Sequence, residues 1–267
     1  MERFQIIGHR GVPCDAPENS LSSFRRAAEL NLEAIECDIR MTCDGHLVLM
    51  HDRTVDRTTD GTGEVSCLPL DSIAKLDCGS WFDVAYVGER VPTLEQLLDA
   101  VDEDMHLILE LKETHRWRAA TDQVLELIRE REMVDRVTLT SFYWDPLQRV
   151  RHVEPGMQIQ ALVASLRDDS TNVDPGIGPE HIAYGSLREL LSDPRLTLVD
   201  TVCPGADEVS EELVKSLHAR GLSVRTWGAR TDCRCEIERI LRSGADGMTA
   251  DYPAFARSVC DEWYESR

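Results

Sequence analysis

The chain has 267 residues, of which 42% are hydrophobic, and it carries 49 acidic against 29 basic residues for a formal net charge of −20. An acid excess of this size opposes binding to nucleic acid or to an anionic membrane surface, because both partners require a basic patch. No apolar run approaches the roughly 20 residues of a membrane-spanning helix. The N-terminus enters a strand-like run almost at once, which leaves no room for a signal peptide. We therefore expect a cytoplasmic protein without a stable membrane anchor.

Cysteine and lysine usage adds two compositional hints. The nine cysteines are scattered along the chain without a C-x-x-C pair, a pattern that indicates free thiols rather than a zinc site or a disulfide framework. Only Lys75, Lys112 and Lys215 are lysines. An acid excess with so little lysine would suit a high-salt cytoplasm, where salt screens self-repulsion, but a codon bias favouring arginine explains the scarcity equally well.

Short apolar runs alternate with amphipathic segments almost to the end of the chain. The strand-like runs cover residues 4–9, 34–40, 106–112, 136–141, 158–163, 198–203, 223–227 and 247–250. The helix-like segments between them include residues 21–32, 117–133, 210–220 and 236–243. Eight strands with intervening helices, in a chain close to the typical length of about 250 residues, predict a (β/α)8 TIM barrel. We expect residues 1–267 to form a single barrel domain.

Two segments interrupt the alternation. Residues 53–92, which follow the second predicted strand, contain turn signals but no clear helical pattern. We expect them to form a small insertion lobe beside the mouth of the barrel. Residues 166–185 carry several acids and Gly-Pro punctuation, and we expect an ordinary long loop there.

Ionisable residues lie near the ends of two predicted strands. Because side chains alternate between the faces of a strand, Glu36 and Asp38 share one face, and Glu110 and Lys112 share one face of the next strand. Barrel active sites are built at the C-terminal ends of the strands. Converging carboxylates repel one another unless a cation joins them, and an all-oxygen ligand set favours Mg²⁺ or Ca²⁺, with Mn²⁺ as a further possibility, over zinc. The alternative is an ion network in which these acids pair with Arg40 and Lys112.

Two histidines occupy comparable positions. His9 ends the first predicted strand, and His51 follows the apolar run after the second. Imidazole titrates near neutral pH, so two histidines flanking a metal-bound phosphate can serve as general acid and general base. Arg10 offers a planar donor fork suited to phosphoryl oxygens. Which histidine would be the acid and which the base stays open from the residues alone.

An ordered series of motifs resembles the glycerophosphodiester phosphodiesterase family. The series consists of GHRG (8–11), APENS (16–20), ECDIRMTCDGHLVLMHD (36–52), DRTTDGTG (56–63), VPTLEQLL (91–98), LELK (109–112), VRTWGA (224–229) and GADGMTADYP (244–253). The resemblance spans nearly the whole chain and thins only in its middle.

The resemblance implies a barrel with a small insertion and assigns roles to nine residues. These are His9 and His51 as the acid–base pair, Glu36, Asp38 and Glu110 as ligands of one divalent cation, Arg10 and Lys112 on the phosphate, Glu18 supporting the first loop near the phosphate or His9, and Trp227 at the glycerol end of the pocket. The segment after Trp227 departs from the family pattern, so the preferred alcohol group stays open.

The implied reaction is hydrolysis of a small-molecule glycerophosphodiester to glycerol 3-phosphate and an alcohol. The nucleophile would be water, or the neighbouring glycerol hydroxyl acting through a cyclic phosphate. One alternative is a related barrel lyase of the phospholipase-D-like kind that acts on lysophospholipids, with Trp81, Phe82 and Tyr86 lining an apolar entrance. Another is a barrel that binds phosphodiesters without catalysis. The sequence gives no indication of the oligomeric state.

Overall fold

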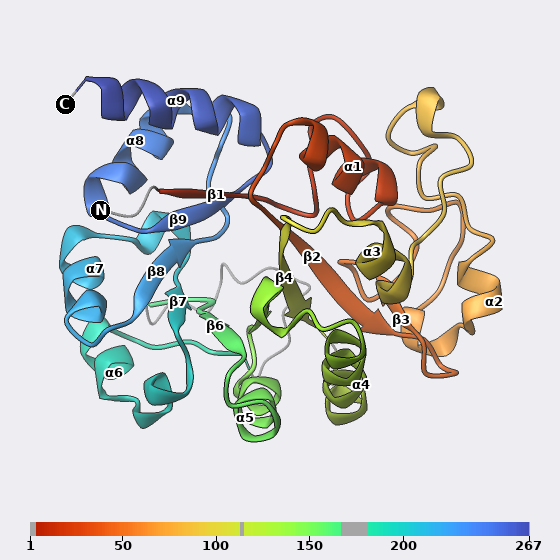
Figure 1. The fold of residues 1–267 in the computed structure, drawn as a ribbon, viewed down its shortest axis with the longest axis horizontal. Helices are drawn as coiled ribbons and strands as arrows, with labels where there is room; N and C mark the ends of the chain where they lie inside the picture. Colours follow the sequence, from red (N-terminus) through yellow and green to blue (C-terminus); the bar gives the residue numbers. More distant parts are fainter. Residues whose placement is uncertain (1–3, 113–114, 167–180, 267) are drawn as a thin grey trace. The chain divides into compact units, whose positions relative to one another are not determined.

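The structure is a computed structural model that describes residues 4–112, 115–166 and 181–266. Its strands are β1 (Gln5–Gly8), β2 (Ala34–Met41), β3 (Leu47–Leu49), β4 (His106–Leu111), β5 (Val137–Ser141), β6 (Gln158–Leu162), β7 (Thr201–Cys203), β8 (Ser223–Thr226) and β9 (Gly247–Ala250). They follow the order β1-β9-β8-β7-β6-β5-β4-β2-β3, in which β3 is antiparallel to β2. This is the topology of a closed eight-stranded parallel barrel with surrounding helices (Figure 1), so the predicted TIM-barrel class is confirmed.

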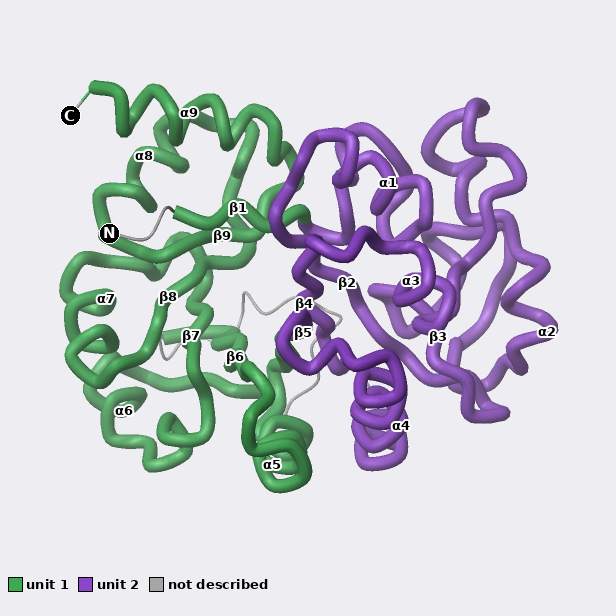
Figure 2. Tube along the Cα trace, viewed as in Figure 1, with its two compact units in different colours: residues 1–8, 138–267 green, residues 9–137 purple. Residues whose placement is uncertain are grey.

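The chain divides into two compact units (Figure 2). Unit 1 comprises residues 1–8 and 138–267, and unit 2 comprises residues 9–137. Unit 2 contains most of the predicted site residues. Its helices are α1 (Leu21–Glu29), α2 (Leu70–Ile73), α3 (Leu94–Ala100) and α4 (Trp117–Glu130), with 3₁₀ turns at Val65–Cys67, Val84–Tyr86 and Val134–Arg136.

Strands β2 and β4 form the centre of unit 2. They are parallel, and their register places Asp38 opposite Glu110. All eight residues of β2 are buried, so the charged side chains on its alternate positions have little access to bulk water. The apolar residues at the intervening positions of both strands are almost completely buried: Ile35, Cys37, Ile39, Leu107, Leu109 and Leu111.

Strand β3 is absent from the predicted elements. It has only three residues and pairs antiparallel with the end of β2, with Ile39 opposite Leu49 and Met41 opposite Leu47. The tight turn between the strands has Gly45 at a φ of +92°, a conformation that favours glycine. A run this short gives no period that would separate it from a loop.

Residues 53–92 contain only α2 and two 3₁₀ turns, in agreement with the weak helical pattern of this segment. Their apolar side chains pack together and onto Val48 of β3 and Met50 just after it. The buried members of this cluster are Val48, Met50, Val55, Val65, Ile73, Cys78 and Val91. The assignment of residues 53–92 as an insertion within a single barrel domain stays a prediction.

Unit 1 contains the remaining strands and helices. Its helices are α5 (Trp144–Val153), α6 (Leu187–Ser192), α7 (Glu211–His218), α8 (Arg234–Ser243) and α9 (Pro253–Glu265). Its 3₁₀ turns include Pro194–Leu198 and Ala206–Glu208. Helix α8 ends at Gly244, whose φ of +81° is the left-handed C-cap conformation. Of the predicted long loop, residues 167–180 lie outside the described residues.

Most predicted segments match observed elements, with ends that differ by a few residues. Strand β7 begins three residues later than predicted, at Thr201, because a 3₁₀ turn ends at Leu198 just before it, and α1 and α4 each end three residues earlier than predicted. Within the described ranges, no helix has both the length and the apolar character needed to cross a membrane.

Candidate active site

Three carboxylates from two neighbouring strands converge in unit 2. Glu36, Asp38 and Glu110 each place an oxygen within 4.8 Å of the other two. Their exposed fractions are 5%, 1% and 8%, so each is withdrawn from water. Burying an ionised carboxylate without compensation is very costly, and three together repel one another as well. The arrangement therefore demands positive charge.

The carboxylates respond differently to this environment. Burial raises the pKa of Glu36 well above its usual value, and the charges of Asp38 and Glu110 add to the effect. Burial would also raise the pKa of Asp38, but the nearby cations Lys112 and Arg10 outweigh it and hold that pKa well below its usual range. Protein cations thus suffice to keep Asp38 ionised, whereas Glu36 lacks enough compensation from side chains alone.

The cluster fits a hard divalent cation. The Glu36 Oε1 atom is buried and has no hydrogen-bond partner in the part of the chain that the structure describes. A cation would satisfy this oxygen and would favour the ionised form of Glu36. Carboxylate oxygens are the ligands of Mg²⁺ and Ca²⁺, whereas zinc sites use histidine and cysteine far more often.

Two basic side chains lie against the cluster. The Lys112 Nζ atom is 2.9 Å from Glu110 Oε1 and 3.2 Å from Asp38 Oδ1. The Arg10 Nε atom is 3.1 Å from Asp38 Oδ2, and Arg10 Nη1 is 2.8 Å from Glu18 Oε1. The Lys112 pairs realise part of the alternative ion network. Arg40 donates from Nε and Nη2 to the backbone carbonyl of His51, at 3.0 and 2.7 Å.

The loop after β1 holds Arg10 in a left-handed conformation with a φ of +53°. The backbone N–H of Arg10 donates to Glu36 Oε2 at 3.1 Å, and His9 Nε2 lies 4.0 Å from that oxygen. Gly11 follows with a φ of +92°, and a Cβ there would lie 2.3 Å from Ser23 Oγ. The Ser23 hydroxyl donates to the Arg10 carbonyl at 3.0 Å and accepts from the Val12 backbone N–H at 2.7 Å. The loop therefore fixes Arg10 through backbone contacts to buried groups.

Asn19 is a site residue that the sequence analysis missed. Its side-chain amide donates to Asp38 Oδ2 at 2.7 Å, and its side-chain oxygen accepts from the Asp38 backbone N–H at 3.1 Å. Asn19 has a φ of +56°, a region that asparagine tolerates better than most residues. The following residue, Ser20, caps α1 by accepting from the Ser23 backbone N–H. The APENS motif thus positions both a carboxylate and the first helix.

His51 is buried and hydrogen-bonded to a neighbouring carboxylate. Its Nδ1 atom is 2.7 Å from Asp52 Oδ1. Burial alone would raise the pKa of Asp52, but hydrogen bonds from Arg57 and His51 lower that pKa to about 2. An ionised Asp52 can only accept, so Nδ1 carries the hydrogen and Nε2 is the basic nitrogen of the neutral ring. Burial also lowers the pKa of His51, which favours the neutral ring near pH 7.

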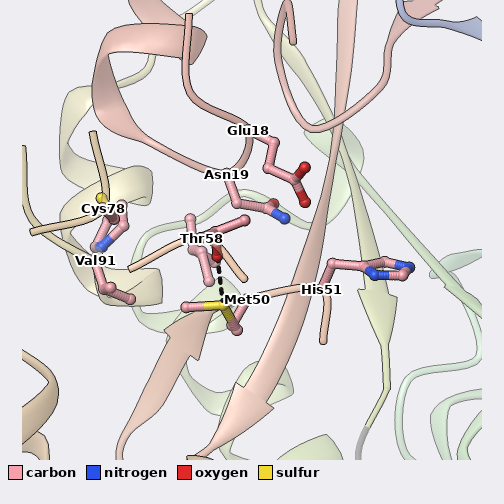
Figure 3. A pocket seen from close by; sticks show the side chains of 9 residues that line it. Glu18, Asn19, Met50, His51, Thr58, Cys78 and Val91 are labelled. Carbon is pink, nitrogen blue, oxygen red and sulfur yellow. Dashed lines mark hydrogen bonds between the residues drawn. The ribbon is translucent and has the colours of Figure 1, made fainter. Parts of the chain in front are cut away.

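Glu18 and His51 line a small pocket in unit 2 (Figure 3). The other lining residues are Asn19, Leu49, Met50, Thr58, Cys78, Val91 and Pro92. Thr58 Oγ1 contacts the Met50 sulfur at 3.3 Å across this pocket. Glu18 and Asn19, in the loop after β1, line one part of the pocket. Residues of the 53–92 segment line another part of it, so this segment contributes to the surroundings of His51.

Trp227 lies in unit 1, directly after β8. Its indole N–H donates to the Val163 carbonyl at 3.0 Å, and its ring meets Phe142 edge to face with the centroids 5.2 Å apart. Trp227 also packs against a buried cluster that includes Leu162 and Cys203. The side chain is therefore held in place, and its contact with a glycerol group stays a prediction.

The fold and the site together define a class of protein. A parallel (β/α)8 barrel with buried carboxylates, two adjoining cations and a histidine held in one tautomer is suited to hydrolysing a phosphodiester. The model of the glycerophosphoryl diester phosphodiesterase family matches residues 9–255. The chain belongs to this family, which confirms the resemblance of its motifs and makes it a phosphoric diester hydrolase.

Individual relatives agree with this membership. The chain is 31% identical over 250 residues to a glycerophosphodiester phosphodiesterase of Caldanaerobacter subterraneus subsp. tengcongensis, with 93% of this chain and 94% of the relative covered. It is 32% identical to the bovine glycerophosphodiester phosphodiesterase 1, with 94% and 80% covered. Its fold is similar to that of an Oleispira antarctica phosphodiesterase solved with the product sn-glycerol-3-phosphate, with a TM-score of 0.82, 25% identity and 96% of both chains covered.

Proposed function

We propose that this protein hydrolyses small glycerophosphodiesters to glycerol 3-phosphate and an alcohol at the site in unit 2. Family membership supports the reaction class. The observation that carries the placement is the convergence of Glu36, Asp38 and Glu110 to within 4.8 Å, with Lys112 and Arg10 beside them. We expect this cluster, rather than a surface patch, to receive the phosphate.

Glu36, Asp38 and Glu110 would hold one divalent cation, Mg²⁺ or Ca²⁺, with Mn²⁺ as a third candidate. When bound, such a cation supplies Lewis-acid polarisation of phosphoryl oxygens and neutralises negative charge. The Glu36 Oε1 atom, which has no hydrogen-bond partner among the residues that the structure describes, supports this assignment. Asp38 already accepts from Asn19 and pairs with Lys112, so its orientation is set before a ligand arrives.

The basic side chains would bind and orient the phosphate. Arg10 has a planar donor fork suited to phosphoryl oxygens, and its pairing with Glu18 and Asp38 fixes the direction of that fork. The Lys112 ammonium is buried and provides a compact positive charge. Donors held in advance where charge builds up lower the barrier without reorganisation during the reaction.

His9 and His51 would transfer the protons. The Asp52 contact directs the His51 hydrogen to Nδ1, so Nε2 can accept a proton from a nucleophile or, once protonated, deliver one to the leaving alcohol. His9 would perform the complementary transfer from the other side. Trp227 would wall the glycerol end of the pocket.

Domain organisation and location complete the proposal. We propose a single barrel domain over residues 1–267, with residues 53–92 as a small lobe within it, and a cytoplasmic location. The proposal includes neither a nucleic-acid partner nor a membrane anchor, in keeping with the net charge of −20.

The test is glycerol 3-phosphate release from glycerophosphocholine by the purified protein. We expect release that a chelator abolishes and that Mg²⁺, Ca²⁺ or Mn²⁺ restores. Lysophosphatidylcholine serves as the comparison substrate. Faster turnover of lysophosphatidylcholine than of glycerophosphocholine would contradict the proposed substrate class, and release that no chelator affects would contradict the metal.

A further inference from the structure

Arg57 connects Glu18, in the loop after β1, to Asp52, next to His51, and makes a two-point contact with each carboxylate. Its Nη1 and Nη2 atoms donate to Glu18 Oε2 and Oε1, both at 2.8 Å. Its Nε and Nη2 atoms donate to Asp52 Oδ2 at 2.7 Å and Oδ1 at 3.0 Å. One guanidinium therefore holds two carboxylates, each through both of its oxygens. We call this arrangement the Arg57 bridge.

Each carboxylate of the bridge also contacts a residue with a proposed role in the reaction. Glu18 Oε1 accepts from Arg10 Nη1 at 2.8 Å as well as from Arg57. Asp52 Oδ1 contacts His51 Nδ1 at 2.7 Å as well as Arg57. The bridge is thus one connected chain of contacts from the proposed phosphate-binding arginine to the proposed proton-transferring histidine.

The charges on the bridge match this role. Burial would raise the pKa of Glu18, but the hydrogen bond from Arg57 and the charge of Arg10 lower it. Both carboxylates are therefore ionised near pH 7 and can act only as acceptors. The Arg57 side chain is 44% exposed, so it lies at the rim of the site, where an exposed ion pair adds little to stability. A contribution to stability therefore does not explain why Nε, Nη1 and Nη2 of Arg57 all donate to carboxylates.

We propose that Arg57 is a positioning residue that sets the orientation of His51 through Asp52 and of Arg10 through Glu18. This inference rests on the proposed function, because it concerns the same site, and it adds a residue that lies outside the metal, phosphate and proton-transfer roles. The positioning depends on fork geometry rather than on charge. Lysine presents a single ammonium and cannot give two-point contacts to two carboxylates at once.

The test compares Arg57→Met and Arg57→Lys with the matched control Arg53→Met. Arg53 is an exposed arginine four residues earlier in the same segment, and it takes no part in the bridge. With glycerophosphocholine as substrate, we expect Arg57→Met to lower kcat about tenfold and to raise KM about tenfold, within the range typical for residues that orient others at an active site. Arg57→Lys should stay within about threefold of Arg57→Met. The control should stay within about twofold of wild type, and all three should keep the wild-type Tm within a few degrees.

A double-mutant cycle with Asp52→Asn identifies the path to His51. Because Arg57 acts on kcat through Asp52, Arg57→Met should no longer lower kcat in the Asp52→Asn background, whereas its effect on KM should persist. Full additivity of the two losses in kcat would overturn the path. A wild-type rate in either Arg57 variant would overturn the positioning role.

A spectroscopic measurement makes the inference independent of turnover. In protein with ¹⁵N-labelled histidine, the His51 ring should be the Nδ1–H tautomer in wild type and in Arg53→Met, and Arg57→Met should shift it towards a mixture. An unchanged tautomer in Arg57→Met would overturn the proposal even if the enzyme showed no activity on any diester. Absence of turnover in wild type, with the tautomer shift present, would refute the proposed function alone.

Discussion

Replacing Lys112 with methionine removes the buried positive charge from the carboxylate cluster while keeping a similar volume. The Lys112 side chain is 4% exposed and pairs with Glu110 at 2.9 Å and with Asp38 at 3.2 Å. Breaking a buried ion pair by removing one partner costs about 3–5 kcal/mol of unfolding free energy. One of the remaining carboxylates can bind a proton, which removes its uncompensated charge. For a group with an ordinary pKa near 4, protonation at pH 7 costs about 4 kcal/mol, and this cost limits the destabilisation. We therefore expect a loss of about 4 kcal/mol at pH 7.

The sign of the pH dependence follows from the same groups. Lys112 and Arg10 hold the pKa of Asp38 well below its usual value, so this ionisation stabilises the wild type above the unfolded pKa and the contribution is lost as the pH falls. Without Lys112, the carboxylate pKa rises in the folded state, and the penalty shrinks by about 1.4 kcal/mol for each pH unit. The difference between variant and wild type should therefore fall to about 1 kcal/mol at pH 5.

Urea unfolding in the presence of a chelator, at pH 7 and pH 5, measures both quantities. Lys75→Met is the matched control, since Lys75 is exposed and its replacement should change stability by less than about 0.5 kcal/mol. A Lys112→Met variant as stable as the control at pH 7 would refute the reasoning, and so would a penalty that grows as the pH falls.

Three further predictions concern other parts of the site. His9→Ala and His51→Ala should each lower kcat by about 10²–10⁴-fold with unchanged far-UV circular dichroism, because each removes one proton transfer; a rate within threefold of wild type would remove that histidine from the mechanism. The Asp52 pKa is lowered to about 2, so the ionised side chain stabilises the fold fully above about pH 4, and this contribution is lost as the pH falls towards 2. Asp52→Asn should therefore reduce the loss of unfolding free energy between pH 4 and pH 2 by at most about 1 kcal/mol, because the pair is partly exposed. Urea midpoints between pH 2.5 and 6 measure this, and an unchanged acid limb would contradict it. Gly11→Ala should destabilise the protein by about 2–4 kcal/mol, because a Cβ would lie 2.3 Å from Ser23 Oγ at a positive φ; a thermal melt within 2 °C of wild type would contradict the steric argument.

The alternation of residues along two strands was enough to predict that the three carboxylates converge. It predicts that Glu36 and Asp38 face the same side, and that Glu110 joins them from the next parallel strand. The register Asp38–Glu110 realises this convergence. Burial of the intervening apolar residues follows from the same period of two. The barrel class follows in turn from the alternation of strand-like and helix-like segments.

The contacts made by loops could not be predicted in this way. Asn19 can hydrogen-bond to Asp38 because the chain adopts a φ of +56° at Asn19. The periodicity of the sequence does not predict such a backbone conformation. Arg57 lies in an irregular segment and reaches Glu18, which is 39 positions away in the sequence. Partners this distant depend on how a loop folds back rather than on local pattern. Strand β3 was missed for a related reason, since three residues are too few to show a period.

The buried carboxylate cluster should carry a cation-dependent hydrolysis. The most direct test is metal-restored glycerol 3-phosphate release from glycerophosphocholine by Glu36→Gln, with Glu33→Gln as the matched control. Glu33 is an exposed glutamate three residues earlier in the chain, so both variants lose the same formal charge. We predict that chelator-treated wild type and Glu33→Gln regain full release when Mg²⁺, Ca²⁺ or Mn²⁺ is added, whereas Glu36→Gln stays at least about 10²-fold slower with any of them. Equal recovery of both variants would contradict the account.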